Sequence, residues 1–148
     1  MGFLNFWREE KSNYEEQASQ LDLSGSSQEL TPNRKRVDGA IVNRRFNKAI
    51  KDNGGAGKVY RDAVIEETRE LFGCDVLELY ESVGGKRSDR STLPQPAQEA
   101  YMVNESITAN ELERYIGTIG GEDQAEVNER IIGVVRQQSQ QTRKWLPW

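Results

Sequence analysis

The chain has 148 residues, of which 35% are hydrophobic and 30% are charged, with a net charge of −4 and a mean hydropathy of −0.81. This length suits one domain with tails, and the low hydrophobic content predicts a sizeable exposed or disordered fraction. The absence of histidine and the single cysteine, Cys74, exclude an internal disulfide, Ser-His-Asp and Cys-His catalysis and the commonest zinc ligand sets. We therefore expect a protein that is not an enzyme, with no catalytic residue, no cofactor and no metal ligand.

Signals for membrane or export targeting are also missing from the sequence. No apolar run approaches the roughly 18 residues that a membrane span needs, and MGFLNFWREE lacks the pattern of a signal peptide. Phe6 stands where the myristoylation pattern requires Ser or Thr. These features predict a cytoplasmic protein with no integral membrane segment.

The N-terminal residues 1–21 carry apolar side chains at helical spacing, and the acidic side chains lie mostly on the other face. We interpret them as an amphipathic helix. Residues 22–33, DLSGSSQELTPN, show no periodicity and contain Ser, Gly and Pro, which is typical of a flexible linker. We therefore predict a helical domain over residues 34–144, followed by an aromatic tail at residues 145–148.

Within the helical domain, the first predicted helix covers residues 35–51, with a narrow apolar stripe of Ala40, Ile41, Phe46 and Ile50 and a stop at the glycines after Asn53. The second runs from about residue 57 to 72 and ends at Gly73, with Glu67 in line with apolar residues at i, i+4 spacing. A short helix over residues 76–83 follows, with Asp75 as its predicted N-cap and Gly84 after its end.

Two longer helices are predicted toward the C-terminus. Thr92 and Gln95 have the spacing of a capping box, which predicts a helix behind them that extends to about residue 116. The last helix covers about residues 123–144, and its Gln-rich end is expected to fray. No strand-like alternation of useful length is found, so we predict an all-α small helical bundle of five or six helices with a flexible N-terminal segment.

The strongest functional signal is a basic segment, residues 33–61, with nine Lys or Arg against two acids, a balance of +7 in a chain of −4. Such segregation builds a positive field that attracts phosphate or an acidic partner. Asn43 and Asn47 are of the type that reads base edges. The candidate nucleic-acid-binding residues are Arg34, Lys35, Arg36, Arg44, Arg45, Lys48, Lys51, Lys58 and Arg61.

Two other interpretations of this segment stay open. It forms a solvated face, or it pairs with residues 62–83, which hold seven acids against one base. An acidic protein partner is a further alternative. The glycine-rich stretch Gly54–Lys58 lies at the entry to a helix, where backbone amides bind anions, but it departs from the Walker A pattern and an ordinary turn is the better interpretation.

The other chemically suggestive residues favour structural roles. The carboxylates of the predicted helices show no metal-binding spacing and are interpreted as solvated faces. Cys74 follows Gly73 and is expected to be a small buried residue rather than a reactive thiol.

Aromatic residues gather at both ends of the chain. We predict that they dock onto a protein partner, or else that they pack onto the body or onto a sister subunit. The candidate partner-binding residues are Phe3, Phe6, Trp7, Trp145 and Trp148.

Residues 71–113, from LFGCDVLELYESVGGKRSDR to NESITANELE, resemble the helical segment that follows the N-terminal domain in BRO-type antirepressors and DNA-damage-inducible protein D families. The corresponding elements are Leu71–Gly73, Gly84–Arg90 and Leu93–Glu113. The β-containing N-terminal domain of those families is absent, and no functional residue is carried over. The resemblance implies a DNA-associated regulatory role.

Together these patterns predict a non-enzymatic accessory or regulatory protein that binds nucleic acid through a basic helix. The alternative is a protein–protein adaptor that docks through its aromatic termini and the basic segment.

Overall fold

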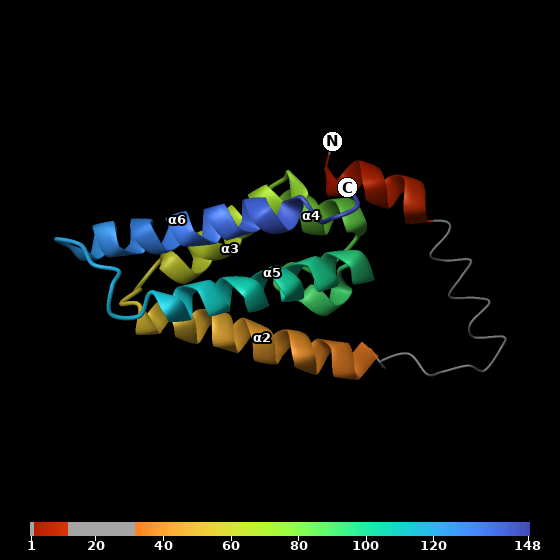
Figure 1. Ribbon diagram of the computed structural model, residues 1–148. Helices are drawn as coiled ribbons and strands as arrows, with labels where there is room; N and C mark the ends of the chain where they lie inside the picture. Colours follow the sequence, from red (N-terminus) through yellow and green to blue (C-terminus); the bar gives the residue numbers. More distant parts are fainter. Residues whose placement is uncertain (1, 12–31) are drawn as a thin grey trace.

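The computed structural model describes residues 2–11 and 32–148, apart from the side chains of residues 32–37 (Figure 1). Residues 3–11 are helical. The later elements are α2 (Pro32–Asp52), α3 (Val59–Phe72), α4 (Val76–Val83), the 3₁₀ turn η1 (Arg90–Thr92), α5 (Gln95–Arg114) and α6 (Gln124–Arg143). The described part of the chain contains no strand, so the prediction of an all-α helical bundle is confirmed. None of its helices has the length and apolar character to span a bilayer.

The four long helices form two parallel pairs. α2 packs along α5, and α3 packs along α6, while α5 and α6 contact each other across the bundle. The parallel direction of α3 and α6 follows from their side-chain contacts. Glu66 of α3 meets Arg136 of α6, and one turn later Glu70 meets Gln140. Figure 1 shows α4 and both described chain ends at one end of the bundle and the α2–α3 and α5–α6 connections at the other.

The interior consists of two apolar clusters with polar residues between them. The cluster near α4 includes Leu71 and Phe72 from α3, and the cluster near the interhelix connections includes Val59 and Ala63 from the same helix. Glu67 and Thr68 lie between these two sets on α3 and are fully buried. On α5 the buried polar residues likewise lie between the two clusters, and on α6 they follow the residues of the second cluster, so a buried polar layer crosses the bundle. Its buried members are Glu67, Thr68, Asn104, Glu105, Thr108, Ser139 and Thr142, and the half-buried Asn43 and Arg90 complete it.

Several predicted helix ends are found in the structure. Gly73 and Gly84 follow α3 and α4 in the left-handed conformation, each with φ of 70°, which a residue with a Cβ adopts only at a cost. Asp123 caps α6 by accepting a hydrogen bond from the Glu126 amide at 2.8 Å.

Two local predictions are wrong, and a third holds only in part. Thr92 does not cap α5, because its hydroxyl accepts from the Lys86 amide at 2.8 Å, and α5 begins instead at Gln95 behind Pro94. Asp75 is the N-cap residue of α4, as predicted, but its side chain makes no capping hydrogen bond and instead accepts from Arg69 at 3.0 Å. The Gln-rich end of α6 stays helical to Arg143 because Ser139 and Thr142 pack inside the bundle.

The aromatic ends pack against each other and against the bundle. Phe3 is fully buried, with its ring 5.2 Å from that of Phe72 and 4.8 Å from that of Trp148. The indole of Trp148 donates to the Leu71 carbonyl at 2.7 Å. The predicted boundaries at residues 34 and 145 therefore do not separate the ends from the bundle, because residues on both sides of them share one core.

Candidate functional site

The exposed side of α2 carries a row of cations, which we call the basic face. The helix buries Phe46, Ala49 and Ile50 against the bundle. Arg44, Lys48 and Lys51 follow one another at spacings of four and three and are exposed, so they lie on the opposite side of the helix. Ile41, predicted to belong to the apolar stripe, is 53% exposed and continues this outer row.

The cations of α2 differ in how far they are already engaged. Arg45 lies beside the basic face and donates from Nε and Nη2 to Glu113, both at 2.9 Å, and to Asn110. This hydrogen-bonded pair raises the pKa of Arg45 and lowers that of Glu113. Lys48 pairs with Asp52 at 2.6 Å, and that contact raises the pKa of Lys48. The Lys48 side chain is 74% exposed, so this pair is screened and contributes little to stability.

The other described cations of α2, Arg44 and Lys51, are free to bind a ligand. Arg44 makes one long hydrogen bond, at 3.5 Å to the Ala40 carbonyl, and within the described residues neither Arg44 nor Lys51 forms an ion pair. Arg34, Lys35 and Arg36 belong to the first turns of α2, and their side chains lie outside the described part of the structure.

The acidic residues 62–83 do not neutralise the described cations of α2. Glu66 binds Arg136 of α6 at 2.6 Å, and Asp75 binds Arg69. At the end of the basic segment, Arg61 contacts the adjacent residue Asp62, at 3.9 Å. The alternative in which this acidic stretch covers the basic helix is therefore not the arrangement found among the described side chains.

Asn43 and Asn47, whose side chains are of a type that can read base edges, make hydrogen bonds within the protein. Asn43 donates to Glu105 of α5 at 3.2 Å, and Asn47 donates to Asn43 at 3.3 Å. Both amides are used inside the protein, because this side of α2 faces α5.

The glycine-rich connection between α2 and α3 is held by α6. The Asn128 side chain accepts from the Ala56 amide at 3.3 Å and donates to the Ala56 carbonyl at 2.9 Å, and Gln124 donates to the Gly54 carbonyl. The Gly55 amide donates to Ile50. Lys58 and Arg61 stand beyond this connection, at the start of α3, and the fold does not place them on the basic face.

Among the described residues, the buried polar layer contains groups with strongly perturbed pKa values. Arg90 from η1 donates to both oxygens of the fully buried Glu105, at 2.7 and 2.8 Å, and its guanidinium lies 4.1 Å from the ring centroid of Tyr101. Burial opposes the charge of Arg90, but Glu105 outweighs this effect and raises the Arg90 pKa. Removing the cation would leave a buried carboxylate without its countercharge.

Glu67 of α3 is the second buried carboxyl of this layer. Asn104 donates to its Oε1 and to the Ser139 hydroxyl, both at 3.0 Å, while Glu67 Oε2 accepts no hydrogen bond. Burial first, and then the negative charge of Glu105, raise the pKa of Glu67 well above the usual range of a glutamate. Protonation gives this carboxyl an O–H donor, and the charge of the neighbouring Glu105 carboxylate favours that protonated form.

Sequence reasoning missed this layer, although one signal was present. Glu67 stands in line with apolar positions of α3, where a solvated glutamate is not expected. Nothing in the sequence shows that Arg90 and Glu105 meet it there. No group of three or more potential metal-binding side chains occurs among the residues that the structure describes.

Two further features carry no reactive chemistry. Cys74 is 8% exposed, and burial, with Glu78 and Asp75 adding to it, raises the pKa of its thiol to about 11. This keeps the thiol protonated and unreactive at neutral pH.

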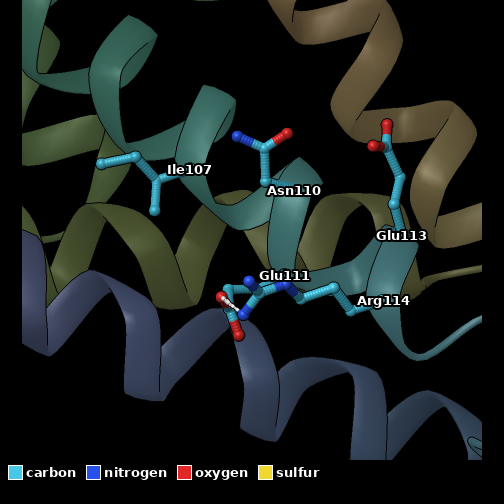
Figure 2. Close-up of a pocket in the computed structure, with 5 residues that line it drawn as sticks. All are labelled: Ile107, Asn110, Glu111, Glu113 and Arg114. Carbon is cyan, nitrogen blue, oxygen red and sulfur yellow. Dashed lines mark hydrogen bonds and ion pairs between the residues drawn. The ribbon is translucent and has the colours of Figure 1, made fainter.

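Figure 2 shows an open depression along α5, lined by Ile107, Asn110, Glu111, Glu113 and Arg114. The charged groups of this depression already form ion pairs, since Arg114 pairs with Glu111 at 3.3 Å and Glu113 pairs with Arg45 of α2.

The five candidate partner-binding residues differ in how far their side chains are buried. Phe3 and Trp148 belong to the interior contacts described above, and Phe6 and Trp7 pack partly buried against the same cluster. Phe3 is therefore not a surface anchor, because its ring is needed to close that end of the bundle. Trp145 differs from the others, with 74% of its surface exposed.

Comparison with protein-family models, with curated proteins and with solved structures finds no match for this chain.

Proposed function

We propose that the protein is a non-enzymatic accessory or regulatory factor that binds nucleic acid through the basic face of α2. The observation that carries this proposal is the alignment of Arg44, Lys48 and Lys51 on the solvent side of the helix, opposite its buried residues. A straight row of exposed cations on a rigid helix suits a chain of phosphates. The acidic residues that dominate the rest of the protein disfavour contact elsewhere on its surface.

The binding energy would come mainly from the release of counterions condensed on the nucleic acid. Each neutralised phosphate contributes about 0.9 to the slope of log affinity against log salt. Three contacts therefore predict a loss of affinity of about 40-fold between 50 and 200 mM salt. Lys48 exchanges an exposed contact with Asp52 for a phosphate, which costs little because that pair is already solvated.

The test is fluorescence-anisotropy binding of the protein to labelled duplex DNA, single-stranded DNA and RNA at both salt concentrations. The triple variant Arg44→Ala, Lys48→Ala, Lys51→Ala should lose most of the affinity. A matched triple variant, Lys86→Ala, Arg87→Ala, Lys144→Ala, removes the same charge from exposed positions outside α2 and should bind nearly as well. Equal losses in the two variants, or no binding by the parent protein at 50 mM salt, would refute the proposal.

Exposed Trp145 favours a second candidate, an adaptor that docks onto another protein. A large exposed aromatic side chain is a typical anchor of a protein interface. The adaptor is supported if the parent protein fails to bind nucleic acid and if Trp145→Ala, with the fold intact by circular dichroism, abolishes capture of a defined partner.

A further inference from the structure

Among the described side chains of α2, the basic face presents mainly cations. Besides Arg44, Lys48 and Lys51, its described outer row contains Ile41, which has no polar group, and Asp52, whose carboxylate pairs with Lys48. Direct readout of base sequence needs several side chains that match the hydrogen-bonding groups of neighbouring base edges. A row with one arginine and two lysines lacks this variety.

The amides that would supply such readout are directed into the protein. Asn43 is held by Glu105, and Asn47 is held by Asn43. Releasing Asn43 would also take a hydrogen bond away from the fully buried Glu105 carboxylate. Because these amides are hydrogen-bonded within the buried polar layer, they do not face a ligand on the outer side of α2.

The face also lacks a stacking platform. Proteins that hold single strands combine cations with aromatic rings on which bases stack. The one aromatic residue of α2, Phe46, is fully buried, and the described exposed aromatics Tyr115 and Trp145 lie after α5 and after α6.

On the basis of the proposed function, we infer that the basic face binds the phosphates of a nucleic-acid duplex without reading base sequence. The partner is a duplex rather than a single strand because the face neutralises charge but cannot stack bases. Arg44 has a guanidinium that can make a bidentate contact to guanine, and in this mode it contacts phosphate like its neighbours.

The experiment compares labelled duplexes of alternating A·T and alternating G·C sequence and an unstructured single strand of oligo(dT), at salt concentrations from about 50 to 200 mM. We expect affinities for the two duplexes within about threefold of each other and weaker binding to oligo(dT). Arg44→Ala should lower the salt slope by about 1 on both duplexes alike. Asn47→Ala should bind each duplex as the parent protein does.

The outcomes separate this inference from the proposal on which it rests. A difference above about tenfold between the duplexes, a loss confined to the G·C duplex in Arg44→Ala, or tighter binding to oligo(dT) would overturn the inference and leave nucleic-acid binding in place. Absence of binding to all three probes would overturn both.

Discussion

Replacing the buried acid Glu67 by glutamine should stabilise the protein, and increasingly so as the pH rises. In the folded protein, burial and the charge of Glu105 raise the pKa of Glu67 well above its usual range, whereas the unfolded chain has an ordinary glutamate. Folding therefore takes up a proton at any pH between these two pKa values. The stability that Glu67 provides is fully present below the unfolded pKa and is lost as the pH rises through the folded pKa.

The magnitude follows from one proton. The free energy of unfolding falls by about 1.4 kcal/mol per pH unit within that window, and Glu67→Gln removes this slope. Glutamine keeps the shape of the protonated carboxyl and accepts from Asn104 through its oxygen, and it carries no negative charge beside Glu105 at any pH. Glu105 and Arg90 face the same layer in both proteins, so their contributions largely cancel from the difference.

Urea unfolding followed by circular dichroism at pH 5, 6 and 7 measures the effect. The advantage of Glu67→Gln over the parent protein should grow by about 1.4 kcal/mol for each pH unit within the window. Glu81→Gln, on the exposed side of α4, controls for the loss of one carboxylate. Stability curves of the parent and Glu67→Gln that run parallel over this range would show that Glu67 is ionised in the folded protein, and would refute the reasoning.

Three further outcomes are expected. Arg90→Ala should destabilise the protein by about 3 kcal/mol in urea unfolding, because Glu105 loses its countercharge in the interior, and a loss below about 1 kcal/mol would contradict this. Gly55→Ala should cost about 1 to 3 kcal/mol, since a Cβ there would lie 2.6 Å from Ile50 Cγ2 and 2.9 Å from its carbonyl oxygen; an unchanged urea midpoint would show that the turn adjusts freely. Cys74 should react with a thiol reagent at pH 8 far more slowly in the folded protein than in urea, because its pKa is raised to about 11, and equal rates would place the thiol at the surface.

The sequence by itself determined the fold class and most helix boundaries. Gly73 and Gly84 end their helices in the conformation that glycine adopts at least cost, and Asp123 caps α6 as a short polar side chain before a helix does. The predicted ranges 57–72 and 123–144 differ by at most two residues from the observed α3 and α6. These features depend on contacts within one turn of the chain, which neighbouring residues are enough to specify.

Only the tertiary structure decided which polar groups leave solvent. Thr92 has the spacing of a capping residue, yet its hydroxyl is used by the turn at Lys86. Asn43 and Glu105 are separated by 62 positions, and their hydrogen bond turns an apparent base-reading amide into part of the interior. The packing of whole helix faces, between residues far apart in the sequence, sets which helices lie side by side. The local signals that end a helix do not specify which helix packs against it.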